Sequence, residues 1–297
     1  MNTIKMLLPL FAALACVPSQ ARAASILDAP LSSFAVLGSS TVTNVPTSNI
    51  RGNVGVWSSG GGNAITGFTS SPVAPTTDSQ VKNGGQVYAG TATAQSAQEQ
   101  LGHAIANLGL MGPGTVLGAN LAGLTLTPGV YSVSAGTSNL TGTLTLDGLG
   151  NANAAWVFQM ASSLITSSGS LVNVINTDSN AGVFWDVRSS ATLGSNSVFQ
   201  GNILANSSIT LDTGATIGCG SALANTGAVT MMSNAISIGC GGGISVPGGG
   251  GTPTFLSFAP ISAVPEPETG SMLLAGLGMI GFLLRRNRHV RWQPESR

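Results

Sequence analysis

The stretch "SSITLDTGATI", Ser207–Ile217, alternates apolar residues with serine and threonine and contains a single charged residue. Two segments align with it without gaps, "SSLITSSGSLV" from Ser162 and "SSATLGSNSVF" from Ser189, and a looser copy, "GAVTMMSNAIS", begins at Gly227. Successive copies start 27, 18 and 20 residues apart. A repeat near this length is too short to bury a core alone, so the copies predict the stacked coils of an all-β solenoid.

Alternation assigns the side chains of each copy to two faces, because successive strand residues point to opposite sides. The residues predicted to point inward are Leu164, Ala191, Ile209, Val172, Phe199 and Ile217. Those predicted to point outward are the column of Thr192 and Thr210, the flanking Ser190 and Ser208, and Thr216. The fourth copy admits two registers one residue apart, and we predict that Val229 does not share one face with Leu164, Ala191 and Ile209. A small apolar strand is expected before each copy, at 154–160, 181–187, 201–206 and 220–225.

One segment, residues 77–110, breaks this pattern and predicts a helix beside the coils. Its apolar residues recur at helical spacing, which indicates one buried stripe. These residues are Ala94, Ala97, Leu101, Ala104, Ile105 and Leu108. Thr77 or Asp78 is the expected N-cap, and Gly84-Gly85 indicate weak first turns.

The composition excludes several classes of function. The 297 residues include 41 glycines, with 43% hydrophobic and only 7% charged residues. Between residues 25 and 260 three cations face seven carboxylates, a net charge of −4, so clustered Lys and Arg for binding nucleic acid are missing. That stretch also contains no apolar run of the roughly 20 residues that span a bilayer.

The residue types also argue against catalysis. The carboxylates are scattered, His103 has no acid beside it, and the glycine-rich stretch 58–67 lacks the lysine of a phosphate loop. The close pair Asp186 and Arg188 is interpreted as an exposed structural ion pair. We therefore predict no enzyme, cofactor or metal site.

Cys219 and Cys240 each lie between two glycines and, in an oxidising compartment, predict a disulfide. Two thiols with His103 are too few for a zinc site.

The two ends of the chain are targeting segments. Residues 1–23 have Lys5, an apolar core and a small-residue cleavage site after Ala23, as in a secretory signal peptide. Cys16 can also be interpreted as a lipoprotein acceptor, although the order "ALAC" departs from that pattern. The predicted solenoid domain spans 24–245, followed by a Gly/Pro-rich linker at 246–263.

The C-terminal segment, 264–297, resembles the PEP-CTERM sorting signal of Gram-negative bacteria. It consists of Val264, Pro265, Glu266 and Pro267, then a short apolar transmembrane helix from Ser271 to Leu284, then Arg285, Arg286 and Arg288. The resemblance implies export, transient anchoring in the inner membrane and processing by an exosortase. The expected location is the cell envelope or the exterior.

The coils themselves resemble the ice-binding-like domain of secreted microbial proteins. The motifs that carry this resemblance are "FAVLGSSTVTNVPTSNIRGNVGV" (34–56), "AITGF" (64–68), "GLTLTPGVYSV" (123–133), "LTGTLTLDG" (140–148), "AAWVFQM" (154–160) and "FQGNILANSSITLDTGATIGCGSALANTGAVTM" (199–231). The resemblance implies a discontinuous right-handed β-solenoid of triangular section, with one long helix alongside and N-terminal coils packed next to late ones. It also implies that one flat face adsorbs to ice.

The candidate ice-binding residues are Ser190, Thr192, Ser208, Thr210, Thr213 and Thr216. "TGAT" at Thr213–Thr216 fits the family's Thr-Ala/Gly-x-Thr/Asn motif, whereas "SNSV" (195–198) and "SNAI" (233–236) depart from it. The alternative function is a non-catalytic matrix or adhesion module associated with exopolysaccharide. Outward positions of Trp57 and Trp185 would favour that alternative.

Overall fold

The computed structural model describes residues 25–58, 64–72, 74–136, 138–245 and 254–255. The chain divides into two units, Met1–Leu256 and Ser257–Arg297, and every described residue belongs to the first. The predicted signal peptide and the whole sorting segment, including its transmembrane helix, lie outside the described residues, so their boundaries stay predictions. Within the described ranges, no helix combines the length and the apolarity that crossing a bilayer requires.

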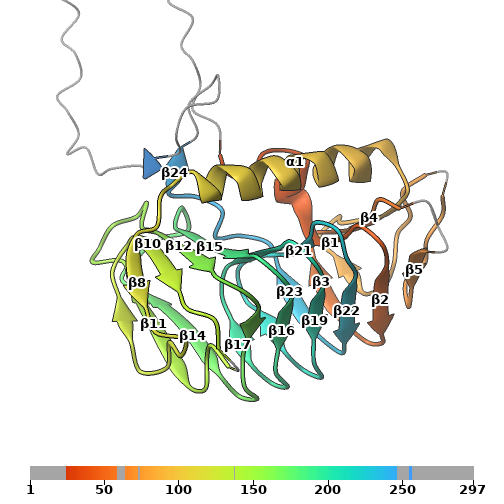
Figure 1. Cartoon of the computed structure of the whole chain (residues 1–297). Helices are drawn as coiled ribbons and strands as arrows, with labels where there is room; N and C mark the ends of the chain where they lie inside the picture. The colour runs from red at the N-terminus through yellow and green to blue at the C-terminus, as the bar shows by residue number, and fades with distance from the viewer. Residues whose placement is uncertain (1–24, 59–63, 73, 137, 246–253, 256–297) are drawn as a thin grey trace, which may run out of the picture. The chain divides into compact units, whose positions relative to one another are not determined.

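Three parallel sheets form the sides of a β-solenoid, and each complete coil contributes one strand to each sheet (Figure 1). The nine-stranded sheet has the order β7 (Val87–Ala89), β4 (Asn53–Val56), β1 (Phe34–Gly38), β21 (Ala222–Ala224), β18 (Asn202–Ala205), β15 (Gly182–Val187), β12 (Ala155–Met160), β10 (Gly129–Val133) and β8 (Thr115–Leu117). The eight-stranded sheet has the order β6 (Val81–Lys82), β3 (Asn49–Arg51), β23 (Ala235–Ser237), β20 (Thr216–Ile217), β17 (Val198–Phe199), β14 (Leu171–Ile175), β11 (Thr143–Asp147) and β9 (Thr125–Leu126). The six-stranded sheet has the order β13 (Leu164–Ile165), β16 (Ala191–Leu193), β19 (Ile209–Leu211), β22 (Val229–Met232), β2 (Val42–Val45) and β5 (Ile65–Thr66).

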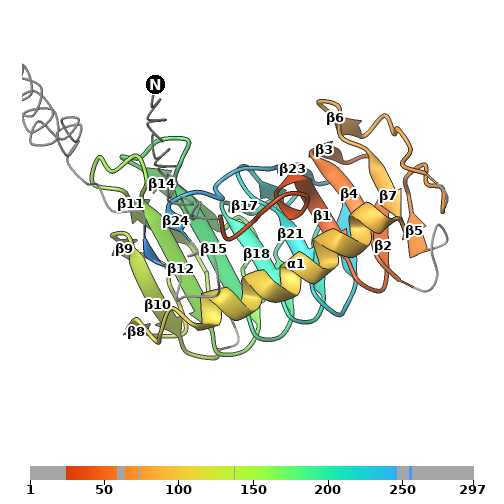
Figure 2. The same cartoon turned by 90° about the horizontal axis from the view of Figure 1, so that it is seen from above.

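The stacking order is discontinuous in sequence. Strand β1 lies between β4 and β21, and β2 lies between β5 and β22, so the first coil of the chain packs on the last coil of the repeat (Figure 2). This confirms the arrangement that the family resemblance implies. A buried polar network joins the two segments, because the Ser48 hydroxyl donates to Asn44 Oδ1 at 2.7 Å and accepts from the Asn234 N–H at 3.0 Å.

The fourth repeat copy is in register with the other three, which corrects our prediction. Ile209 pairs with Val229, and Ala191 pairs with both Leu164 and Ile209. All four side chains are buried. The strand pairing therefore continues without a shift into the copy that begins at Gly227, and Val229 lies on the inward face that we predicted it would not share.

Glycines allow the coils to approach closely at one corner. Gly220 has a φ of +142°, and a Cβ built there would lie 2.1 Å from the carbonyl oxygen of Gly201 in the neighbouring coil. A side chain at this position would force the two coils apart. The Cys219–Cys240 disulfide beside this corner confirms the predicted pairing.

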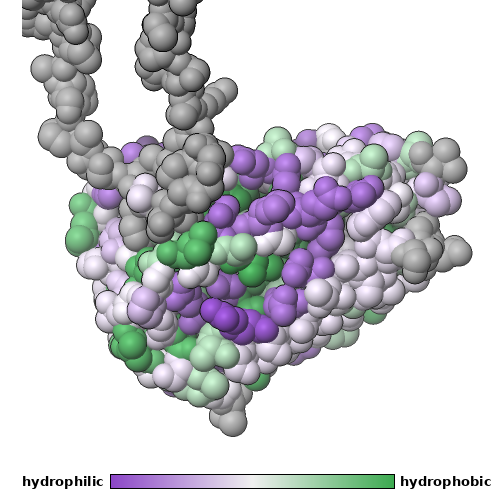
Figure 3. Space-filling model, turned by 45° about the horizontal axis from the view of Figure 1, so that its top comes forward, coloured by the Kyte–Doolittle hydropathy of each residue, from purple (hydrophilic) through white to green (hydrophobic). Residues whose placement is uncertain are grey.

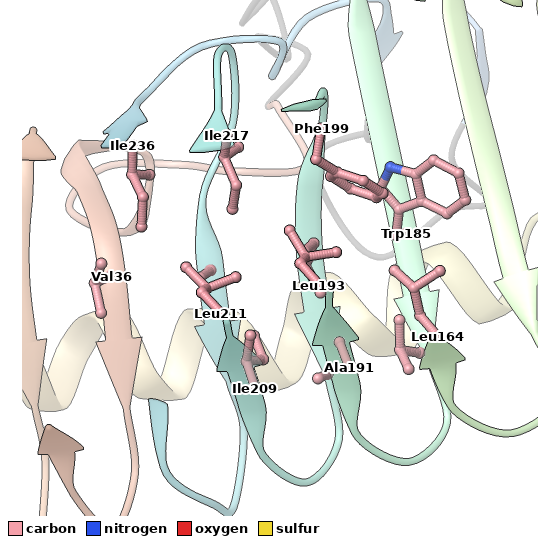
Figure 4. Close-up of a cluster of buried hydrophobic side chains, with 14 of the residues drawn as sticks. Val36, Leu164, Trp185, Ala191, Leu193, Phe199, Ile209, Leu211, Ile217 and Ile236 are labelled. Atoms are coloured by element: carbon pink, nitrogen blue, oxygen red, sulfur yellow. The ribbon is translucent and has the colours of Figure 1, made fainter. Parts of the chain in front are cut away.

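The inward residues of successive coils form one continuous core, as Figure 4 shows for Ala191, Ile209, Phe199 and Ile217. Trp185 is fully buried in it, with its ring centroid 4.0 Å from that of Phe158. Its indole N–H donates to the Gln200 carbonyl at 3.0 Å. The possibility that Trp185 faces outward is therefore wrong, because its position in β15 belongs to the inward set. Trp57 is 37% exposed.

Helix α1 (Ala92–Gly109) lies across the outer side of the nine-stranded sheet (Figure 2). Its buried stripe contains Ala94, Ala97, Leu101, Ala104 and Leu108, as predicted, whereas Ile105 is half-buried. Gln98 fixes the helix to the sheet, since its Nε2 donates to the carbonyls of Ala224 and Asn225 at 3.1 and 2.7 Å. Strongly hydrophilic residues gather along the helix side of the molecule (Figure 3).

The helix begins later than the sequence predicts. Thr91 is the N-cap, whereas Thr77 and Asp78 lie in the segment before β6. Asp78 accepts hydrogen bonds from the backbone N–H groups of Thr69 and Gln80, both at 2.8 Å. The residues between Asp78 and Thr91 form β6 and β7, because Val81 and Val87 extend the solenoid by one more coil.

Replacing Thr91 by alanine is expected to lower the free energy of unfolding by about 1 kcal/mol. The Thr91 hydroxyl accepts a hydrogen bond from the Ala94 N–H at 3.3 Å, which alanine cannot replace. Urea unfolding measures the change, with Thr91→Ser as the control that retains the acceptor. Equal stabilities of the alanine and serine variants would show that this cap contributes nothing.

The predicted ion pair of Asp186 and Arg188 is not formed. Asp186 is only 2% exposed and lies on the helix side of β15, whereas Arg188 is exposed beyond the end of that strand. Burial raises the pKa of Asp186 to about 6, partly offset by the positive charge of Arg188. The sequence suggested an exposed pair, but the helix covers the acid.

Residues of the predicted linker also pair with the domain. β24 (Ile244–Ser245) forms an antiparallel pair with β25 (Thr254–Phe255), which falls inside the predicted 246–263 linker. Every other strand pair in the described part of the chain is parallel.

Candidate functional site

A row of threonines runs across five neighbouring strands of the six-stranded sheet. Thr192 pairs with Thr210, Thr210 with Thr230, Thr230 with Thr43, and Thr43 with Thr66. We call these five residues the threonine column. Ile165 precedes it on β13, in register with Thr192. Each threonine follows a buried residue of its strand, so period-two alternation places all five outward.

The hydroxyls of the threonine column are available to solvent. None of the five side-chain hydroxyls forms a hydrogen bond with another described residue. Four of the threonines are half-buried, and Thr66, on the edge strand β5, is exposed. Threonine is stiff at χ1, so its hydroxyl and methyl groups hold a narrow range of positions. Neighbouring strands of a sheet lie about 4.8 Å apart, which sets the spacing of the column.

A second row of small residues runs beside the column, two positions earlier on each strand. It contains Ser190, Ser208, Ala228 and Thr41. The Ser190 hydroxyl accepts from the Ser208 N–H at 3.3 Å, and the Ser208 hydroxyl accepts from the Ala228 N–H at 3.1 Å. These bonds fix the two serine side chains against the sheet, so the row is regular and does not project far from the sheet.

On the other side the column is bordered by Asp212, Met232 and Val45. Asp212 is the one ionisable residue among the outward positions of the described six-stranded sheet. Val45 is 51% exposed, which places an apolar edge next to Thr43. The centre of this face therefore combines hydroxyl and methyl groups and contains no charge.

The structure brings together four of the six predicted site residues. Ser190, Thr192, Ser208 and Thr210 lie on the same face, in the column and in the row beside it. Thr213 is exposed at the corner after β19, and Thr216 lies on β20 of the eight-stranded sheet. The "TGAT" motif thus crosses a corner between two faces, and its Ala215 is fully buried. The Thr216 hydroxyl also differs from those of the column, since it donates to the Ser197 carbonyl at 3.3 Å.

Thr43, Thr66 and Thr230 also belong to this face, although they are not among the residues predicted from the sequence. A signal was present, because Val42-Thr43, Ile65-Thr66 and Val229-Thr230 repeat the pair Ile209-Thr210. Placing these pairs in one row requires the discontinuous stacking of β2 on β22, and no sequence period contains that information.

The other two faces differ from this one in chemistry. Helix α1 covers the nine-stranded sheet. The eight-stranded sheet presents Leu171 and Val198 toward one end and the cations Arg51 and Lys82 at the other. The six-stranded face is therefore uncovered and has no charge at its centre, where it presents a regular array of small side chains.

The chain is thus a β-solenoid with one uncovered face of small side chains. The chain belongs to the ice-binding-like family, whose model matches residues 36–237. A second model, the PEP-CTERM protein-sorting motif, matches residues 263–288. Both matches confirm the resemblances described above.

Several curated proteins and solved structures are similar to this chain. An ice-binding protein of Nostoc sp. (strain HG1) is 40% identical over 275 residues, which covers 92% of this chain and 91% of the relative. One from Flavobacterium frigoris (strain PS1) is 30% identical and covers 69% of this chain and 73% of its own length. The crystal structure of an ice-binding protein from the Antarctic ascomycete Antarctomyces psychrotrophicus superposes with a TM-score of 0.62 at 33% identity, covering 73% of this chain and 98% of that one.

Proposed function

We propose that this protein is exported and binds ice through the six-stranded face, with the threonine column at its centre. The observation that carries the proposal is the in-register row of five threonines whose hydroxyls have no partner among the described residues. Membership of the ice-binding-like family supports it. The adsorbed protein inhibits the growth and recrystallisation of ice.

The physical mechanism is preorganisation. Equivalent residues lie about 4.8 Å apart between strands and alternate residues about 6.6–6.8 Å apart along a strand, and both spacings are close to repeats of the ice lattice. Water molecules bound to such an array are held in a lattice-like arrangement before ice arrives, so less ordering entropy is lost on adsorption. The methyl groups add apolar contact area between the hydroxyls.

Adsorption of this kind requires no covalent step, and we propose that the protein is not an enzyme. A charge at the centre of the face would oppose binding, because an ion orders water around itself. Asp212 lies at the border of the face, directly after the end of β19, and leaves the centre neutral.

The sorting motif supports a proposal for the destination of the protein. We propose transient anchoring in the inner membrane by residues 271–284 and processing by an exosortase-type enzyme near Val264–Pro267. The relatives named above are ice-binding proteins, and none is named as a matrix or adhesion protein. They therefore give no support to the alternative function.

Purified residues 25–262, which include every described residue, are expected to show thermal hysteresis and to inhibit ice recrystallisation. A heat-unfolded sample at the same concentration is the control, because it retains the composition but loses the array. Recrystallisation equal to that in buffer at micromolar protein would refute the proposed function.

A further inference from the structure

The eight-stranded sheet contains an unusual concentration of positive charge at one end. Between residues 25 and 255 the cations are Arg51, Lys82 and Arg188, and two of them are direct neighbours. Arg51 on β3 pairs with Lys82 on β6, and both side chains are exposed on the outer side. Like charges opposite each other on adjacent strands destabilise a sheet. Their juxtaposition in a domain of net negative charge therefore needs an explanation other than stability.

No carboxylate in the described part of the chain neutralises this pair. The Lys82 ammonium donates to the Ser79 carbonyl, and Arg51 has no ion pair with a described acid. Asp78, the acid nearest in sequence, is already occupied by its hydrogen bonds from Thr69 and Gln80. Burial of Asp78 works against its ionised form, but these hydrogen bonds outweigh burial and lower its pKa.

Arg51 also separates two hollows in the surface. The larger, about 440 Å³, lies over Gly52 and is lined by Asn83, Ser237 and Ile238 among others. The smaller, about 230 Å³, is lined by Asn49, Thr216 and Ser237 among others. The larger hollow by itself falls in the size range of small-ligand sites, roughly 300–1,000 Å³. Arg51 lines both hollows, whereas Lys82 lines neither and is reached from Arg51 across the strand pair.

The floor of the larger hollow is made of closely packed backbone. A Cβ on Gly52 would lie 2.6 Å from Ile238 Cγ2, and a Cβ on Gly85 would lie 2.4 Å from the Gly52 carbonyl oxygen. Neither glycine can take a side chain without displacing its neighbours, so the hollow is a fixed part of the fold. Ile238 is 39% exposed beside it and provides an apolar wall.

From this geometry we propose that Arg51 and Lys82 form a binding site for an acidic saccharide. The two cations bind the carboxylate of a uronic acid unit. The amide and hydroxyl groups of Asn83, Asn49 and Ser237 bind sugar hydroxyls, and Ile238 contacts the apolar side of a ring. The site lies on a different face from the threonine column, so a bound saccharide leaves the six-stranded face open.

The test is isothermal titration of the protein with trigalacturonate. Wild-type protein is expected to bind it, with an affinity that falls as salt is raised. The double variant Arg51→Gln/Lys82→Gln is expected to bind at least roughly tenfold more weakly, since removing a single charge-assisted hydrogen bond is enough for a tenfold change. Arg188→Gln removes the same charge from another hollow, lined by Ser132 and Gln159, and is expected to bind like wild type.

Two control ligands, the free energy of unfolding and the ice activity make the result decisive. Binding of maltotriose, a neutral trisaccharide, or of inorganic phosphate as tightly as trigalacturonate would overturn the proposal, because it requires both the acid and the sugar. Loss of binding in Arg188→Gln, or its survival in the double variant, would overturn the location. Relief of the like-charge repulsion means that the double variant must unfold at a free energy equal to or above that of wild type, and its ice activity must be unchanged. That last readout separates failure of this site from failure of the ice-binding face.

Discussion

Replacing Thr210 by tyrosine is expected to raise the protein concentration needed for half-maximal recrystallisation inhibition by at least roughly tenfold. Thr210 lies at an interior position of the threonine column, between Thr192 and Thr230. A tyrosine ring would project beyond the flat surface and hold the adjoining hydroxyls away from the ice. Loss of one or two hydrogen bonds to the ice surface, each worth about 1 kcal/mol, is enough for a change of that size. Tyrosine is favoured in strands, so the coil itself is expected to fold.

Thr216→Tyr is the matched control, because it makes the same substitution at an outward strand position on another side of the solenoid. Thr216 lies on the eight-stranded sheet, and we expect recrystallisation inhibition to be unchanged there. The two variants distinguish the faces directly. Full activity of Thr210→Tyr together with loss in Thr216→Tyr would move the ice-binding surface to the eight-stranded sheet, and both variants would first be checked for wild-type unfolding.

The sequence carries the coil-by-coil pattern well, since that pattern is local. Inward and outward positions of the late copies follow from period-two alternation, and the burial of Ala191, Ile209 and Ile217 confirms them. Which coils stack on each other across a large sequence distance cannot be predicted from this local pattern. Val42–Val45 pairs with Val229–Met232, although almost the whole domain separates these two strands in sequence. It extends the threonine column beyond the copies that periodicity detects.

Two interpretations of the strand Gly182–Val187, an outward Trp185 and an exposed Asp186, are wrong for the same physical reason. Helix α1 and the neighbouring coils cover this strand. The strand Gly182–Val187 is buried on both sides, with Trp185 toward the core and Asp186 under the helix side. A sequence that contains an indole and a carboxylate in adjacent positions suggests one exposed side. Because both faces are covered, the alternation that normally separates polar from apolar residues fails here.

Burial of Asp186 makes the stability of the protein depend on pH. Its pKa in the folded state is raised to about 6, whereas an unfolded Asp has a pKa near 3.8. The folded protein therefore binds more protons than the unfolded chain between these values, and stability falls as pH rises through that window. Above pH 6 the ionised carboxylate costs about 3 kcal/mol relative to a group with no shift.

Asp186→Asn removes the charge while keeping the shape of the side chain. The variant is expected to be more stable than wild type by up to about 3 kcal/mol at pH 7–8, with the difference shrinking to near zero at pH 4 and below. Urea unfolding of both proteins from pH 4 to pH 8 measures this difference, and taking the difference cancels the titration of the other carboxylates. A stability difference that stays constant over this range would mean that Asp186 does not titrate there.

The opposite sign is expected for Asp147, which makes it the control. Hydrogen bonds from the Leu149 N–H and the Asn176 amide, both at 2.9 Å, lower the pKa of its carboxyl group. Its contribution to stability is therefore present above the unfolded pKa and is lost as pH falls. Asp147→Asn is expected to be no more stable than wild type at pH 7, so the two variants must diverge as pH rises. Parallel pH profiles would contradict burial as the cause of the Asp186 shift and hydrogen bonding as the cause of the Asp147 shift.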